Sequence, residues 1–89
     1  MHTDALAVYP GAREAALRGV RTGGDPRNRE YVQAHLTSSA SPDGEALCMD
    51  PQTSGGLLAA VPASVFPSLS AMWTQVGEVA SGPAAIELR

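Results

Sequence analysis

The densest apolar pattern lies in the second half of the chain. Residues 57–61 form an uninterrupted apolar run of strand length, which is typical of a strand covered on both faces. A proline ends this run, and Ser64 then stands as an N-cap before apolar residues spaced as on one face of a helix. These residues are Val65, Leu69, Met72, Trp73 and Val76. The pattern predicts a buried central strand at 57–61 and a helix over 64–76 that places Met72 and Trp73 in the core.

Weaker signals predict shorter elements on both sides of this pair. Residues 76–80 and 84–88 are predicted to be strands joined by a turn at 81–83, which gives a β-α-β-β ending. Near the start, residues 4–8 are predicted to be a strand and the alanine-rich stretch 12–18 a helix. This order of elements is typical of α+β and α/β domains.

The middle of the chain is less decisive. Residues 19–28 contain a glycine pair and an Asp-Pro step and are predicted to form a loop. Residues 29–36 fit a helix or a strand, and their periodicity does not choose between the two. Residues 37–44 are polar and rich in turn formers, which predicts an exposed loop.

Composition limits the possible classes of function. Eighty-nine residues, 44% apolar and 17% charged, make one small globular domain or part of one. All six basic residues are arginine and the net charge is −3, which argues against a nucleic-acid partner. The absence of lysine excludes a P-loop lysine and a Schiff-base lysine. The single cysteine, Cys48, excludes an internal disulfide, and His2 and His35 belong to no cluster with metal-ligand spacing.

The sequence does not predict insertion into a membrane or export. No apolar run approaches the roughly 20 residues that span a bilayer. The first residues do not form a basic segment followed by an apolar one. We therefore expect no membrane partner and a cytoplasmic location.

A polar loop precedes the predicted central strand. Thr53 and Ser54 offer hydroxyl groups there, and the Gly55-Gly56 pair can turn backbone N–H groups outward as a nest for an anion. The same glycines can instead serve only the close packing of a tight loop. The residue types alone favour neither interpretation.

The nine residues DPQTSGGLL at 50–58 closely resemble the C-terminal signature of selenophosphate synthetase (selenide, water dikinase), in the aminoimidazole-ribonucleotide-synthetase-like superfamily. The similarity covers nearly all of the chain, and the further matching stretches are 9–12, 19–28, 60–62 and 77–79. It implies that residues 1–89 are a single partial domain, the C-terminal half of the family's C-terminal domain. The implied fold is α+β, with helices covering a mixed sheet.

The resemblance also implies a reaction and a site. The family converts ATP, selenide and water to selenophosphate, AMP and phosphate with magnesium. The residues that would face substrate or phosphate are Gly23, Gly24, Arg27, Asn28, Asp50, Gln52, Thr53, Ser54, Gly55 and Gly56. Thr22 and Asp25 depart from the family's pattern around the glycine pair, and Asp25 adds a negative charge beside it.

The family's lysine and metal-binding aspartates, which lie in its N-terminal domain, have no counterpart in this sequence. We therefore assign no catalytic residue and no metal ligand. The isolated chain is expected to be inactive and to hold no cofactor alone, since ATP and Mg²⁺ are implied only for the full-length family.

Two other interpretations stay open. One is a stand-alone binding or oligomerisation module derived from this superfamily, and the other is a different member such as a thiamine-phosphate kinase-like protein. A partial domain leaves apolar sheet surface uncovered, so we expect self-association as a dimer. A separate ATP-binding N-terminal domain is the other expected partner.

Overall fold

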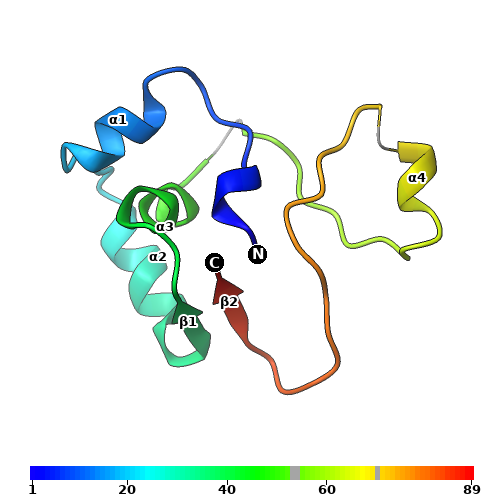
Figure 1. Ribbon diagram of the computed structural model, residues 1–89. Helices are drawn as coiled ribbons and strands as arrows, with labels where there is room; N and C mark the ends of the chain where they lie inside the picture. Colours follow the sequence, from blue (N-terminus) through cyan, green and yellow to red (C-terminus); the bar gives the residue numbers. More distant parts are fainter. Residues whose placement is uncertain (53–54, 70) are drawn as a thin grey trace.

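The computed structural model describes residues 1–52, 55–69 and 71–89. Its elements in chain order, with η for a 3₁₀ helix, are η1 (Thr3–Ala5), α1 (Ala12–Leu17), α2 (Asp25–Val32), η2 (Gln33–His35), β1 (Leu36–Ser38), α3 (Pro42–Met49), α4 (Phe66–Leu69) and β2 (Ile86–Leu88). Figure 1 shows α1, α2 and α3 gathered beside β2 and the two chain ends. Residues 55–69, which we call the arm, lead away from this cluster and end in α4 (Figure 1).

The sheet brings the two ends of the chain together. β1 and β2 pair in parallel, with Leu36 opposite Ile86. The first residues continue the pairing on the other side of β2: the Arg89 N–H donates to the Met1 carbonyl over 2.9 Å, and the Thr3 N–H donates to the Arg89 carbonyl over 2.8 Å. Helices with a small sheet confirm the predicted α+β class. The expected mixed sheet is not found, because the strands of the described residues form one parallel pair.

The core is small and centres on α3. Among the described residues the buried apolar side chains are Ala16, Ala46, Met49 and Leu88. Leu88 is only 1% exposed and lines the same cavity as Met49. α1 and α2 both pack on α3. One helix thus supports both of its neighbours, and the carboxyl-terminal strand supplies the largest buried apolar side chain.

Helix α3 replaces part of the loop predicted at 37–44. The Ser41 Oγ accepts a hydrogen bond from the Gly44 N–H over 3.3 Å, and Pro42 occupies the first turn, where its missing N–H costs little. Gly44 is buried against Thr3, whose Oγ1 would lie 2.5 Å from a Cβ at that position. Residues 37 and 38 belong to β1. Residues 37–39, 41 and 42 are exposed, but the loop is limited to residues 39–41 because the turn-forming residues from Ser41 onward cap and begin a packed helix.

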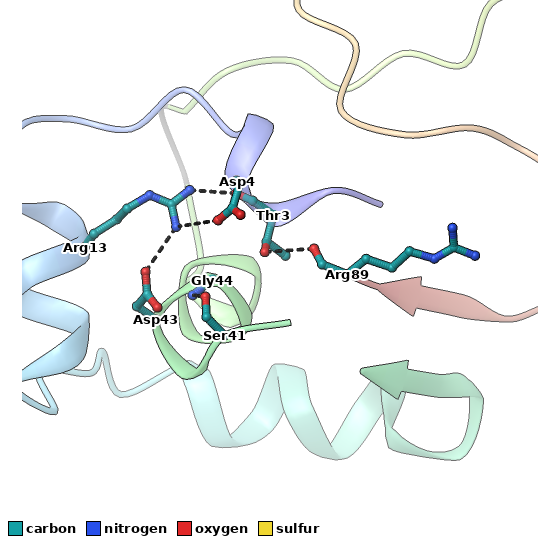
Figure 2. Close-up of polar contacts among 7 residues, drawn as sticks. All are labelled: Thr3, Asp4, Arg13, Ser41, Asp43, Gly44 and Arg89. Atoms are coloured by element: carbon teal, nitrogen blue, oxygen red, sulfur yellow. Dashed lines mark hydrogen bonds and ion pairs between the residues drawn. The ribbon is translucent and has the colours of Figure 1, made fainter. Parts of the chain in front are cut away.

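A polar cluster fixes α1 against α3 and the chain ends (Figure 2). The Arg13 guanidinium donates to the Thr3 carbonyl over 2.7 Å and to Asp43 Oδ2 over 3.1 Å, and it lies 3.8 Å from Asp4 Oδ1. The Thr3 hydroxyl donates to the Arg89 carbonyl over 3.0 Å. Arg13 is therefore engaged in holding the fold together, since a guanidinium with these partners is already neutralised and hydrogen-bonded.

The Arg29–Glu45 ion pair, which joins α2 to α3, predicts a loss of stability in acid. A hydrogen bond from Ser38, followed by the Arg29 guanidinium, lowers the pKa of Glu45 below its ordinary value. The stabilisation from Glu45 is therefore complete above the pKa that Glu45 has in the unfolded chain. It is lost as the pH falls through the pKa that Glu45 has in the folded chain. Between these two pKa values, we expect the free energy of urea unfolding to depend less on pH in Glu45→Gln than in the natural chain.

The matched control for this prediction is Glu30→Gln, which changes an exposed glutamate on α2. We expect it to keep the acid dependence of the natural chain. If the free energy of unfolding depends on pH equally in Glu45→Gln and in the natural chain, the assigned role of Glu45 is contradicted.

The predicted central strand at 57–61 is wrong. Leu57 and Leu58 are 84% and 78% exposed, and residues 57–61 form no hydrogen bond with any part of the chain that the structure describes. A strand exists only where neighbouring backbones accept its N–H and C=O groups. β1, β2 and residues 1–3 pair with one another instead. The apolar run is real, but no surface of the described residues covers it.

The other corrections have related causes. The helix predicted at 64–76 is reduced to α4, Met72 is 86% exposed and Trp73 is only partly buried, because an isolated amphipathic segment is marginal without a covering surface. Residues 76–80 are not a strand, and 84–88 shortens to β2, so the β-α-β-β ending is wrong. Residues 4–8 are likewise not a strand.

The helix predicted at 12–18 is confirmed as α1, which follows Gly11 at φ 86°. In the two regions that follow α1, the structure differs from the prediction. The loop predicted at 19–28 ends early because α2 begins at Asp25, and residues 29–36 complete α2, form η2 and enter β1.

Candidate functional site

The fold brings together the two stretches that the sequence predicts to face phosphate. The Asn28 side-chain amide donates to the Met49 carbonyl over 2.8 Å, which joins α2 to the end of α3. Gly24, just before α2, packs against Pro51, just after α3. Because α2 packs on α3, the start of one helix meets the end of the other. We call this junction, residues 23–28 with 49–52, the loop pair.

The glycines of these stretches have different surroundings. A Cβ at Gly24 would lie 2.6 Å from Pro51 Cγ, whereas one at Gly23 would meet nothing within 4 Å. A Cβ at Gly55 would lie 2.8 Å from Gln52 Cβ, and Gly56 faces open space. Gly23, Gly24 and Gly56 do not have positive φ, the conformation that an alternating anion nest requires. At Gly24 the packing interpretation is therefore favoured. Thr53 and Ser54 lie outside the described residues.

Two carboxylates accompany the loop pair. Asp25 is buried at the first residue of α2; its Oδ2 lies 4.0 Å from Arg21 Nε and has no hydrogen-bond partner among the described residues. An acid at this position interacts favourably with the helix dipole and competes with any bound anion. Asp50 accepts a hydrogen bond from the Gln52 side chain. Negative charge thus lies on both sides of the junction.

Five of the six arginines lie between residues 13 and 29, and this arginine cluster supplies little free positive charge to offset it. Arg13 pairs with Asp43, Arg29 pairs with Glu45, and the Arg21 guanidinium donates to the Ala16 carbonyl over 2.7 Å. Arg27 and Arg18, in contrast, contact no partner within the described ranges. Since Arg27 belongs to α2 and to the loop pair, it is the cation there that remains available to an anion.

A cavity of about 200 Å³ adjoins the loop pair, and no pattern in the sequence predicts it. Its lining is mostly apolar and comes from α2, α3, both strands and residue 1: Met1, Asn28, Tyr31, Val32, Leu36, Cys48, Met49, Ile86 and Leu88. Burial raises the pKa of the Cys48 thiol above its ordinary value. The thiolate, which is the nucleophile, is therefore disfavoured. Cys48 itself is only partly buried.

The described part of the chain contains neither a cluster of metal ligands nor a helix that could span a membrane. Residues 1–52, 55–69 and 71–89 contain no group of three or more His, Cys, Asp or Glu side chains placed to hold a metal ion. Within the same ranges, every helix is too short or too polar to cross a membrane.

Sequence comparison identifies several selenide, water dikinases as relatives of this chain. A selenide, water dikinase of Caldanaerobacter subterraneus subsp. tengcongensis is 41% identical over 59 residues, 65% of this chain and 17% of that protein. The selenide, water dikinase of Haemophilus ducreyi is 34% identical over 79 residues, 89% of this chain and 22% of that protein. One from Shewanella sp. strain ANA-3 is 39% identical over 61 residues, 68% of this chain and 17% of that protein. No family model and no solved structure matches.

The chain thus spans about a fifth of the length of the curated relatives that it matches. The nine-residue motif at 50–58 and the matched stretches point to the same proteins. Over the matched residues, this chain is a segment of the selenide, water dikinase family.

Proposed function

We propose that this chain contributes a phosphate-facing loop pair to a selenide, water dikinase and does not catalyse the reaction alone. The observation that carries the proposal is the junction of Gly24 with Pro51 and of Asn28 with Met49. It joins two stretches that are well separated in the sequence and that resemblance to the family assigns to one cleft. The names of the matched relatives support selenide as a substrate.

The chemistry of the loop pair supports weak binding. In this proposal a phosphate meets backbone N–H groups and hydroxyls of residues 53–56, and Arg27 supplies the compensating charge. Asp25 and Asp50 oppose the same anion. Phosphoryl transfer depends on positioning and on cations that neutralise the developing charge. One free arginine beside two carboxylates provides little positioning and little positive charge.

The residues present do not fit a magnesium site. Mg²⁺ takes oxygen ligands in near-octahedral geometry, and the described residues contain no group of three or more His, Cys, Asp or Glu side chains placed to hold it. We therefore assign no step of the reaction to this chain. In this proposal an ATP-binding N-terminal domain supplies the metal ligands and the catalytic groups.

Titration of the ¹⁵N-labelled chain with Mg-ATP tests the loop pair. We expect a dissociation constant weaker than about 1 mM, equivalent to about 4 kcal/mol, with shift changes confined to residues 23–28 and 49–56. Arg27→Gln should weaken this binding about tenfold, because a charge-assisted hydrogen bond contributes about 1.5–3 kcal/mol. Arg18→Gln is the matched control, since Arg18 also has no partner in the described structure but lies after α1.

Two kinds of result would refute different parts of the proposal. Equal effects of Arg27→Gln and Arg18→Gln, or shift changes elsewhere, would remove the loop pair as the site. Micromolar affinity, or AMP formation by the purified chain with selenide, would refute its inactivity.

A stand-alone oligomerisation module is the second candidate function. The observation that favours it is the exposed apolar arm, in which Leu57 and Leu58 are the most exposed large side chains. No observation favours a thiamine-phosphate kinase-like protein, because the three relatives named above are all selenide, water dikinases.

A further inference from the structure

Asp25 is a buried carboxylate that the fold leaves without a hydrogen bond on one oxygen. The residue is 7% exposed, and its Oδ2 has no hydrogen-bond partner among the described residues. An ion pair joins that oxygen to Arg21 Nε over 4.0 Å, but the same guanidinium donates to the Ala16 and Val20 carbonyls over 2.7 and 2.8 Å. A buried charge lowers stability unless it is paired and hydrogen-bonded. The negative charge of Asp25 is therefore only partly compensated inside the chain.

This charge lies inside the loop pair, where a bound phosphate would meet it. Asp25 is the first residue of α2 and lies two positions before Arg27, which has no partner in the described structure. Asp50 adds a second carboxylate on the other stretch of the loop pair. Together with Arg21, these side chains carry no net charge. A junction without net charge attracts an anion weakly.

The repulsion from Asp25 rises with the charge of the bound group. Coulomb energy is proportional to the product of the two charges, so a doubly charged phosphate is opposed about twice as strongly as a singly charged one. Burial strengthens the effect, because salt screens a buried charge less than an exposed one. A phosphate at the end of a chain carries about two negative charges near pH 7, whereas a phosphate bonded on both sides carries one.

We propose that Asp25 is a specificity-determining residue that makes the loop pair favour a singly charged phosphate over a doubly charged one. The role rests on the proposed function, and it narrows the ligand group to a phosphate bonded on both sides, which in ATP is an internal phosphate. Arg27 matches the single charge of such a group. Asp25 need not touch the ligand, since it acts by Coulomb repulsion at the start of α2.

Titration of the ¹⁵N-labelled chain with methyl phosphate and with dimethyl phosphate tests this role. The two probes differ by about one charge near pH 7, and constant ionic strength keeps the screening equal. We expect the natural chain to bind dimethyl phosphate more tightly. Asp25→Asn should raise the affinity for methyl phosphate about tenfold and that for dimethyl phosphate about threefold, because the repulsion removed is proportional to the charge of the probe.

Glu30→Gln is the matched control, because it removes the same charge from an exposed position on the same helix. It should change each affinity by less than about twofold, since salt and water screen exposed charges. Asp25→Ser is a second variant, with a side chain that is also common at helix starts, and it should reproduce the shift toward methyl phosphate. Circular dichroism checks that all three variants remain folded.

The outcomes distinguish this role from the proposed function. Tighter binding of methyl phosphate than of dimethyl phosphate by the natural chain overturns the role of Asp25. So does an equal factor for both probes, or no gain, in Asp25→Asn and Asp25→Ser, which indicates a structural effect, and so does an equal effect of Glu30→Gln. In these cases, shift changes confined to residues 23–28 and 49–56 leave the proposed function standing. Shift changes elsewhere, or no binding by any of the chains, overturn both.

Discussion

Replacing Leu88 by alanine is expected to destabilise the protein far more than the same change at any exposed leucine. Leu88 is 1% exposed in a core with few other buried apolar side chains, and truncation of such a leucine costs about 2–5 kcal/mol. A small domain has only about 5–15 kcal/mol of stability in total. The variant should therefore unfold at a much lower urea concentration or be unfolded without urea.

Leu57→Ala is the control for this prediction, because the same side chain is removed from a position that is 84% exposed. At protein concentrations that keep the chain monomeric, we expect a change within about 0.5 kcal/mol. Urea unfolding followed by circular dichroism measures both variants. If Leu57→Ala costs as much as Leu88→Ala, then the apolar run packs in the monomer and the described fold is wrong there.

Replacing Gly24 by alanine is expected to disturb the loop pair directly. The new Cβ would lie 2.6 Å from Pro51 Cγ, so the two stretches must separate or shift, and such overpacking costs about 1–3 kcal/mol. The backbone of Gly24, at φ −87° and ψ −20°, is itself open to alanine. The effect therefore reports on the contact with Pro51 and not on backbone strain.

Gly23→Ala provides a neighbouring control with no steric conflict. A Cβ at Gly23 meets nothing within 4 Å, so we expect a neutral effect or stabilisation by about 0.4–1 kcal/mol through loss of unfolded-state entropy. Thermal unfolding of both variants separates the two cases. Equal stability of Gly23→Ala and Gly24→Ala would show that the stretches at 23–28 and 49–52 do not meet.

Some elements escape prediction although their local signals are present in the sequence. Asp25-Pro26 starts α2 with an acid and a proline in the first turn, as helices often begin. Ser41-Pro42 starts α3 with an N-cap and a first-turn proline. The residue types predict loops at both places because proline, glycine, serine and aspartate serve turns and helix starts alike. Only the residues that follow, and their packing, distinguish the two.

Part of the loop pair could be predicted from the sequence. Resemblance to the family predicts both the motif at 50–58 and the stretch at 23–28, and the structure places residues 49–52 beside 23–28. The sequence does not indicate that Asn28 binds the Met49 carbonyl. Nor does it show that most of the arginine cluster is engaged with other partners. These contacts depend on how α2 packs against α3.

The sequence by itself determined the alanine-rich helix α1, which depends on short-range interactions, together with the α+β class and the motif that relates the chain to its family. Only the tertiary structure decided which apolar residues are buried. Leu88 is buried because its strand, held between β1 and residues 1–3, shares one apolar lining with Val32 of α2 and Met49 of α3, whereas the more apolar run at 57–61 meets no partner within the described part of the chain. Hydrophobicity supplies a driving force for burial, but burial itself requires a second surface.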